Sequence, residues 1–346
     1  MRHLKFALAI MAGAILAACG GNSGSPEPGA QVNKVKFASQ VSFGDSLSDL
    51  GTYNVGAVKA LGGGKYTING DNTAIDPALT GKNWTELMAA QFGLPAPCPA
   101  QTGLEGNASL GFSVPVTDHP GCFSYAQGGS RVTNPVGAGH KLTGSALGAL
   151  TVPFVTQIRN HLARTGGKFK GDEVVFVMTG GNDVLVNLSQ LSAAATAAGQ
   201  QAFGTSLATQ LAAGTTSPAT AVRLIGLAIA TESARAGSTQ ATIVGAAVTA
   251  AVQAGNTTAA ANAEAVAKVA ATAGTQAGTD YVTAQAPAMI AALATAGTEA
   301  AAAVKSQILG NGANYVVVNN LPDVASTPGG RARDANVRAL IDKMVG

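Results

Sequence analysis

The sequence predicts an α/β fold of three layers, with helices on both faces of a parallel sheet. Three short segments rich in apolar residues, at 37–43, 174–178 and 314–319, contain no proline and are each followed by glycine, threonine or asparagine. An amphipathic helical pattern at 155–164 separates the first segment from the second. Buried strands that alternate with helices are typical of a parallel sheet. The hydrophobic content of 47% excludes a disordered chain.

The first residues have the layout of a signal peptide, at 1–18. Arg2 and Lys5 precede an uninterrupted apolar run at 6–18, which is shorter than the roughly 20 residues of a membrane-spanning helix. Leu-Ala-Ala-Cys at 16–19 resembles the bacterial lipobox, so we expect cleavage before Cys19 and a lipid on that cysteine. The alternative is an ordinary signal peptide followed by a chance cysteine.

The residues at 19–35 are expected to form a flexible tether, because they are rich in glycine, serine, proline and asparagine. Gly20 stands where an aspartate would retain a lipoprotein at the inner membrane, and by this resemblance to lipoprotein sorting we expect the outer membrane. The folded domain is expected to span 36–346 and to contact the membrane through the lipid anchor.

The two remaining cysteines, Cys98 and Cys122, lie on either side of a segment rich in proline, glycine and asparagine. An exported chain can keep a disulfide, and with Cys19 acylated no thiol is left over. We therefore expect a disulfide between Cys98 and Cys122. A metal site is not expected, because no cysteine or histidine pair has the spacing of zinc ligands.

The composition changes between residues 191 and 305, where 42 of 115 residues are alanine and eight are charged. Alanine is the best helix former, so we expect a helical insertion at about 192–277. Substrate gating and membrane contact are possible functions of this insertion, and packing on the domain is the simpler alternative. A helix is expected at 280–309 before the third strand, and another at 335–344. The insertion is expected to break at Gly204, Gly214, Pro218, Gly237 and Gly255.

Ser46 follows the first strand directly, in the sequence Gly44-Asp45-Ser46-Leu47-Ser48-Asp49. A strand, a tight turn and a helix start place this serine at the carboxyl edge of the sheet, beside free N–H groups that can stabilise an oxyanion. The alternative is that Ser46 or Ser48 caps the helix. Asp45 and Asp49 are interpreted as turn and helix-start residues.

Two further segments are expected at the same edge of the sheet. Asn182 follows the second strand, and its side-chain amide is a plausible oxyanion donor. The loop at 123–130 contains Gly128 and Gly129, which can offer an unobstructed backbone N–H.

In these segments the chain resembles the GDSL or SGNH serine esterases and lipases. The matching blocks are 41–49, 125–130 and 180–183, and 316–323 is similar to the family's fourth strand and its exit. The resemblance covers about 36–190 and 280–346. It implies a flavodoxin-like SGNH-hydrolase fold and a carboxylic ester hydrolase that forms an acyl-enzyme. It also implies that Ser46 is the nucleophile and that the oxyanion is bound by the backbone N–H groups of Ser46 and Gly129 and by Asn182.

The family's last block, an Asp-x-x-His that supplies the acid and the base, has no counterpart here. A serine without an adjacent base is a weak nucleophile. We therefore expect an inactive, C-terminally truncated form with an incomplete sheet. The alternatives are a non-catalytic surface lipoprotein that retains the ligand pocket and a product that does not fold. Surface or capping roles are expected for His119, His140 and His161.

Other ligands and partners are not expected. Without Arg2 and Lys5, 19 basic residues stand against 18 acidic ones, which provides no electrostatic basis for binding nucleic acid. No glycine-rich fingerprint opens a helix after the first strand, and no Gly-Lys-Ser/Thr is present, so no nucleotide cofactor is expected. The expected substrate is an ester or lipid-like small molecule, and its class is not determined by the fold.

Overall fold

The computed structural model describes residues 35–68, 70, 77–332, 337–338 and 341–342. The chain divides into two units, 1–37 and 38–346, close to the domain start expected at residue 36. The expected signal peptide and Cys19 lie outside the described residues, as does most of the helix expected at 335–344.

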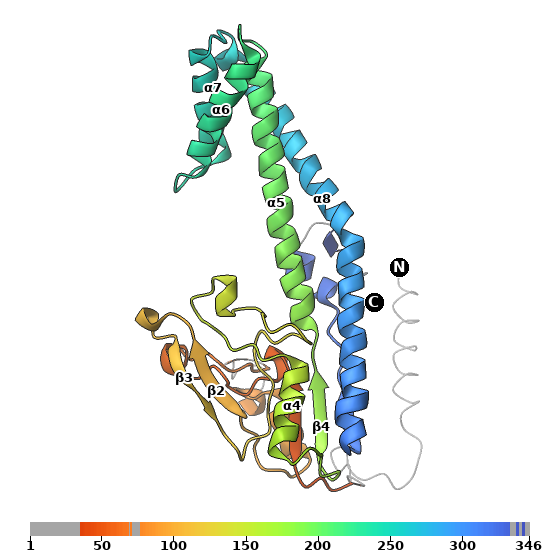
Figure 1. The fold of residues 1–346 in the computed structure, drawn as a ribbon. Helices are drawn as coiled ribbons and strands as arrows, with labels where there is room; N and C mark the ends of the chain where they lie inside the picture. Colours follow the sequence, from red (N-terminus) through yellow and green to blue (C-terminus); the bar gives the residue numbers. More distant parts are fainter. Residues whose placement is uncertain (1–34, 69, 71–76, 333–336, 339–340, 343–346) are drawn as a thin grey trace, which may run out of the picture. The chain divides into compact units, whose positions relative to one another are not determined.

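The central sheet contains β1 (Gln40–Gly44), β4 (Val174–Met178) and β5 (Tyr315–Val318) in the order β1-β4-β5. All pairs are parallel, with Gly44 opposite Met178 and Val177 opposite Val318 (Figure 1). The three predicted strands and the α/β class are therefore confirmed. The first strand begins later than predicted, because residues 38 and 39 reach the sheet only through single hydrogen bonds, from Ala38 N–H to Asp172 and from Val174 N–H to Ser39.

A further extended segment, 123–127, runs beside the free edge of β1. Ser42 N–H donates to Phe123 (3.0 Å), and Tyr125 N–H donates to Ser42 (2.7 Å). The predicted disulfide between Cys98 and Cys122 is present. It closes a loop of the chain that ends directly before this extended segment. Between the cysteines lies a hairpin that was not predicted, with β2 (Gln101–Glu105) antiparallel to β3 (Ser113–Asp118).

Helices cover both faces of the sheet. On one face, Phe43 and Val177 belong to a core with α4 (Phe154–Arg164) and the end of α8 (Ala259–Ala303). On the other face, the Phe176 ring packs against Trp84 of α3 (Trp84–Gln91). The layered arrangement predicted from the sequence is therefore present.

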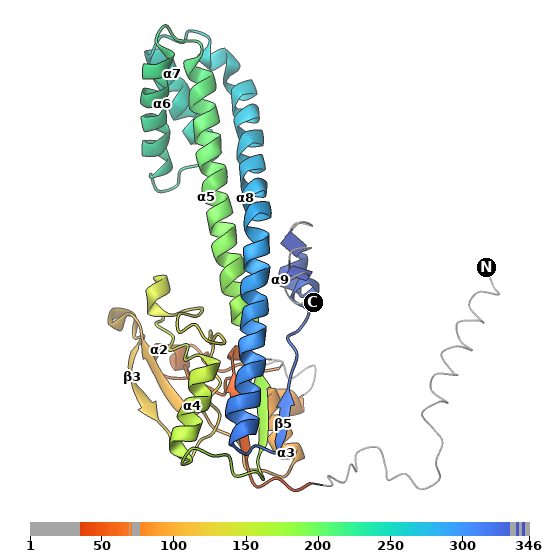
Figure 2. The same ribbon diagram turned by 45° about the vertical axis from the view of Figure 1, so that its right-hand side comes forward.

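The Ala-rich region forms a hairpin of α5 (Gly181–Ala212) and α8, with α6 (Pro218–Ser233) and α7 (Gln240–Gln253) at its far end. Figures 1 and 2 show α5 and α8 side by side. Both helices continue through the expected insertion boundaries at 192 and 277. Gly204 does not break α5, because a glycine inside a helix costs only about 1 kcal/mol. The chain does turn at or beside the other four expected breaks.

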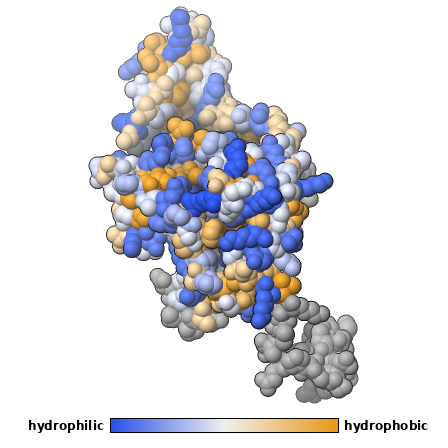
Figure 3. Space-filling model, turned by 60° about the horizontal axis from the view of Figure 1, so that its bottom comes forward, coloured by the Kyte–Doolittle hydropathy of each residue, from blue (hydrophilic) through white to orange (hydrophobic). Residues whose placement is uncertain are grey.

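The hairpin end has its own core, formed by residues of all four helices such as Leu207, Ile225, Ala251 and Ala270. Among the described residues, one segment, Ala259–Asn311, is long and apolar enough to cross a membrane, which is weak evidence for a span. In the view of Figure 3, hydrophilic residues with hydrophobic ones between them cover the side turned forward.

The remaining helices are short: α2 (Gly56–Ala60), α9 (Pro328–Arg331), the π-helix η5 (Val304–Ile308), and the 3-10 helices η1 (Ser46–Ser48), η2 (Pro77–Leu79), η3 (Ala108–Leu110), η4 (Lys141–Thr143), η6 (Leu309–Asn311) and η7 (Val324–Ser326).

Candidate functional site

The turn after β1 depends on Gly44. Its φ of 147° is rarely adopted by residues with a side chain, and a Cβ at this position would lie 1.9 Å from the carbonyl oxygen of Met178. The side chain of Gln157, in α4, binds both polar groups of Gly44. Its Oε1 accepts from Gly44 N–H and its Nε2 donates to the Gly44 carbonyl, each at 2.8 Å. The chain direction is therefore set immediately before Ser46.

Ser46 begins the 3-10 helix η1 and is half-buried. Asp45 caps this helix, since its carboxylate accepts from Leu47 N–H at 3.1 Å. Burial raises the pKa of Asp45 to about 6. Within the described part of the chain, Ser46 N–H and the Ser46 hydroxyl have no hydrogen-bond partner. Both groups are available to a ligand.

Asp49 connects this turn to the loop at 123–130. One carboxylate oxygen accepts from the N–H groups of Gly51 and Thr52, and the other accepts from Gly128 N–H, all at 2.8 Å. Burial raises the pKa of Asp49, which these three donors oppose. Asp45 is thus the helix-start residue and Asp49 holds the turn, so the two kinds of role expected for this pair are both present.

Within the described ranges, the backbone N–H of Gly129 is free, unlike that of Gly128. Gly128 N–H is bound by Asp49, whereas Gly129 N–H has no acceptor among the residues that the structure describes. Gly129 has a φ of 80°, and a Cβ there would lie 2.1 Å from the carbonyl oxygen of Ala138. Only glycine fits this position.

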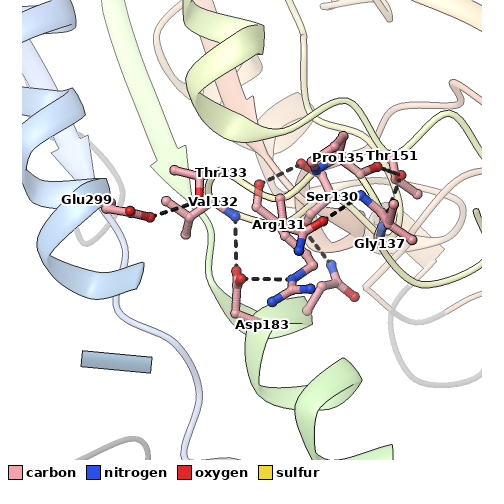
Figure 4. A network of polar contacts seen from close by, with 12 residues as sticks. Ser130, Arg131, Val132, Thr133, Pro135, Gly137, Thr151, Asp183 and Glu299 are labelled. Carbon is pink, nitrogen blue, oxygen red and sulfur yellow. Dashed lines mark hydrogen bonds and ion pairs between the residues drawn. The ribbon is translucent and has the colours of Figure 1, made fainter. Parts of the chain in front are cut away.

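Asn182 is buried in the first turn of α5. One of its amide hydrogens is used, because Nδ2 donates to the Ser130 carbonyl at 2.9 Å. The next residue, Asp183, accepts from Arg131 Nε at 2.9 Å and from Val132 N–H at 3.0 Å (Figure 4). These bonds attach the start of α5 to the loop that carries Gly129.

The structure thus joins the three predicted segments in pairs at the carboxyl edge of the sheet. Gln127 N–H donates to the Gly44 carbonyl at 3.1 Å. Asn182 binds the loop through Ser130, and the backbone of Gly181 is near enough to the Asp45 carboxyl to oppose the rise of its pKa. The contacts place Ser46, Gly129 and Asn182 on adjoining segments, each with at least one N–H group that no acceptor occupies in the described structure.

Gln157 and Arg131 are structural residues of this site that sequence reasoning missed. A signal for Gln157 exists in hindsight, because it lies on the same helical stripe as Phe154, Ile158 and His161, which are all buried. A glutamine on an apolar stripe has to find partners inside the protein. No comparable pattern marks Arg131.

The three described histidines have partners away from Ser46. His119 Nε2 lies 2.9 Å from Thr102 Oγ1, and His140 Nδ1 accepts from Leu142 N–H at 3.2 Å, a capping role as expected. The expectation for His161 was wrong. It is buried among aromatic rings, with Nδ1 3.3 Å from the Tyr125 hydroxyl. Burial lowers the pKa of His161 to about 4.

A cavity of about 380 Å³ opens beside Asp183 at the same edge of the sheet. Apolar residues of α5 and α8, including Val184 and Leu293, line it together with Thr179 and Asn320. No group of three or more possible metal ligands occurs in the described ranges.

Comparisons of the chain with protein-family models, with curated proteins and with solved structures find no match.

Proposed function

We propose that this chain has the site of a carboxylic ester hydrolase of the GDSL or SGNH type, with Ser46 as its nucleophile, in a form that is inactive in turnover because no base is bonded to Ser46 among the described residues. The observation that carries the proposal is the junction of the three motif segments at one edge of the sheet, with Ser46 N–H, Gly129 N–H and one Asn182 amide hydrogen unoccupied within the described residues.

The chemistry is acyl transfer. The Ser46 oxygen bonds to the ester carbonyl carbon, its hydroxyl proton passes to solvent, and the negative charge that develops on the carbonyl oxygen is stabilised by N–H donors that are already fixed in place. The bond to the alcohol then breaks, the alcohol leaves with a proton from solvent, and water hydrolyses the acyl-enzyme. Fixed donors lower the barrier because they need no reorganisation during the reaction. The hydrogen bonds of Gly44, Asp49 and Asn182 to neighbouring segments support such a preorganised site.

The sheet supports the flavodoxin-like assignment. The segment at 123–127 lies beside β1, followed by β4 and β5, and this order corresponds to the 2-1-3-4 order of doubly wound sheets. In such sheets ligands bind at the carboxyl ends of the strands, where the order reverses beside the first strand. Ser46 follows that strand.

The second candidate is a binding protein that retains this pocket without catalysis. It is favoured by the partners of the three described histidines, which are Thr102, Leu142 and Tyr125 rather than Ser46. Attack by a serine hydroxyl needs a base to accept its proton. The two candidates share the oxyanion donors and differ in the reactivity of Ser46.

The first prediction distinguishes them by covalent labelling. We expect a fluorophosphonate to label Ser46 slowly, because no base is bonded to its hydroxyl among the described residues, and Ser46→Ala to abolish the labelling. Asn182→Ala should slow it by about 100-fold, because removal of one oxyanion donor costs about that much. The adduct is located by peptide mass spectrometry.

Ser48→Ala is the matched control, since the Ser48 hydroxyl binds Trp84 Nε1 at 3.2 Å rather than facing a ligand. It should leave the labelling rate unchanged. Absence of label on a folded chain that still binds short esters would favour the binding protein, and equal labelling of Ser46→Ala would exclude Ser46 as the nucleophile.

The membrane partner is part of the same proposal. A lipid on Cys19 would hold the second unit near an outer-membrane surface through the residues at 19–35. Metabolic incorporation of palmitate into the chain, and its loss in Cys19→Ser, is the expected result. Incorporation that survives in Cys19→Ser would contradict it.

A further inference from the structure

A long groove lies along α5 and α8, and residues of α6 and α7, such as Ile229 and Ile243, also line it. Its volume is about 1520 Å³, four times that of the cavity beside Asp183. Helices α5 and α8 approach closely at its floor, where a Cβ on Gly199 would lie 2.9 Å from the carbonyl oxygen of Gly274. Because glycine has no side chain, the space above this contact remains open.

The groove and the small cavity lie on the same side of the helix pair. The cavity is lined by Val184, and the groove by Leu188, Leu191, Ala195, Gly199 and Phe203, at steps of three or four residues along α5. Residues at such steps share one face of a helix. This stripe is about 28 Å long at the rise of 1.5 Å per residue.

The stripe on α8 follows the same rule. Ile290 lines the groove, and Leu293 and Gly297 line the cavity three and seven residues further on. The two spaces are therefore consecutive along the hairpin, and the cavity is at the end that adjoins the sheet. A linear ligand in the groove has one end directed to the edge that carries Asn182.

The lining carries no charge, although Gln200, Gln240 and three serines contribute polar groups to it. Three of the threonines that line the groove offer no hydroxyl hydrogen to a ligand. Thr275, Thr279 and Thr283 each donate to the backbone carbonyl four residues earlier, at 3.0 Å. Their hydroxyl hydrogens are thus used within the helix, and their methyl groups remain for contact with a ligand.

We propose that this groove binds the acyl chain of a long-chain ester, with the ester group at the sheet edge that carries Ser46. An acyl chain is linear, as is the stripe that lines the groove. It carries no charge, and neither does the lining. It has no hydrogen-bond donor, and the hydroxyl hydrogens of Thr275, Thr279 and Thr283 are already used within the helix. The reaction of such an ester rests on the proposed function, whereas binding in the groove does not.

The test measures binding of dodecanoylglycerol and butanoylglycerol to Ser46→Ala, so that hydrolysis does not interfere. Dodecanoylglycerol should bind saturably and at least tenfold more tightly, because each buried methylene adds to affinity. Thr279→Glu in the same background places a charge in the groove and should weaken dodecanoylglycerol binding at least tenfold.

Thr272→Glu is the matched control. Thr272 is exposed on the same helix and also binds the carbonyl four residues earlier, but it does not line the groove. It should change affinity less than twofold. Thr196→Glu, which changes the opposite wall on α5, is a second test if Thr279→Glu alters the helical circular dichroism.

Equal affinity for the two esters, or equal weakening by Thr272→Glu and Thr279→Glu, would overturn the proposal. Self-association of the chain that Thr279→Glu abolishes, without ester binding, would assign the groove to a second copy and overturn it as well. If chain-length selectivity is found while Ser46 stays unlabelled, the groove is supported and the hydrolase is not. If Ser46 is labelled and no chain-length selectivity is found, the hydrolase is supported and the groove is not.

Discussion

Gly44 joins β1 to the turn that presents Ser46, in a space with no room for a side chain. The carbonyl oxygen of Met178, on the neighbouring strand, occupies the direction in which a Cβ would point. Both polar groups of Gly44 are also bound by Gln157. The position of Ser46 therefore depends on backbone packing one strand away.

The second prediction concerns this contact. Gly44→Ala should lower the free energy of unfolding by more than about 3 kcal/mol, because the methyl group adds a clash to the strain of a positive φ. Gly81→Ala is the control, since its φ is 66° and nothing lies within 4 Å of its Cβ position. It should cost only about 1–2 kcal/mol. Urea unfolding measures both, and equal losses would contradict the argument.

His161 shows how a titratable side chain is buried beside the sheet. Its ring packs against Phe43, Phe123, Tyr125 and Phe169, and its Nε2 has no partner in the described structure. Burial lowers its pKa from 6.5 to about 4 because the charged ring loses its hydration, and the positive charges of Arg164 and Lys170 add to the effect. The folded state therefore favours neutral His161.

The third prediction follows from this pKa. As the pH falls below 6.5, the unfolded chain binds a proton that folded His161 does not bind, so stability decreases down to about pH 4, by about 3 kcal/mol. His161→Phe should remove this loss. Asp45, whose pKa is raised to about 6, acts in the opposite direction over part of the same range. The measurement is therefore the difference between variant and wild type in urea unfolding at pH 7 and pH 4.5, and an unchanged difference would contradict it.

At the scale of residues, the sequence predicted the approximate places of Ser46, Gly129 and Asn182 but not the side chains that bind their neighbours. Each of these three residues follows a recognisable turn. The partners of Gln157 and Arg131 lie 113 and 52 residues away along the chain, on Gly44 and Asp183. No local pattern reports such distant pairing, and His161 was misjudged for the same reason.

Among the elements, α5 and α8 approach each other through their small residues. Gly199 and Gly274 face each other, and a Cβ on Gly274 would lie 2.8 Å from the carbonyl oxygen of Gly199. The two backbones are therefore closer than side chains would allow. This contact between Gly199 and Gly274 therefore sets the distance between the two helices at this point.

The fourth prediction tests the contact. Gly274→Ala should destabilise the chain by about 1–3 kcal/mol, because the helices have to separate to admit the methyl group. Gly297→Ala, in the same helix, has open space around its Cβ and should stabilise it by up to about 1 kcal/mol through helix propensity. Thermal unfolding followed by circular dichroism measures both changes. If both variants shift the transition in the same direction, the close approach is not limiting.

The elements with a regular pattern were predictable, and the irregular ones were not. The apolar run at 174–178 corresponds to β4 without any shift. The β2–β3 hairpin has no clean alternation, and its pairing slips between Thr102 and Leu104, so it was missed. The insertion limits were also missed, because α5 and α8 continue smoothly from the sheet into the hairpin.

The second unit contains two large hydrophobic cores that share no residues. The core at the sheet includes Phe43, Tyr125, Phe154 and Phe169, whereas seven of the twelve buried residues at the hairpin end are alanines. Alanine buries little apolar area, and burial stabilises at about 25 cal/mol per Å². The hairpin end is therefore held less strongly than the sheet.

The fifth prediction is a difference in hydrogen exchange. Amides of α6 and α7 should exchange at least tenfold faster than those of β1 and β4, because the hairpin end can open without exposing the sheet. Mass spectrometry of peptides from each element measures the rates. Equal protection of the two regions would mean that the unit unfolds as a single cooperative body.

Asn182 lies in the first turn of α5, whose 32 residues span about 48 Å, and Asp183 beside it is bonded to Arg131 and Val132. The start of α5 is therefore attached to the sheet domain, and its far end carries α6 and α7. A rigid rotation of α5 about its start would move α6 and α7 much further than it moves Asn182.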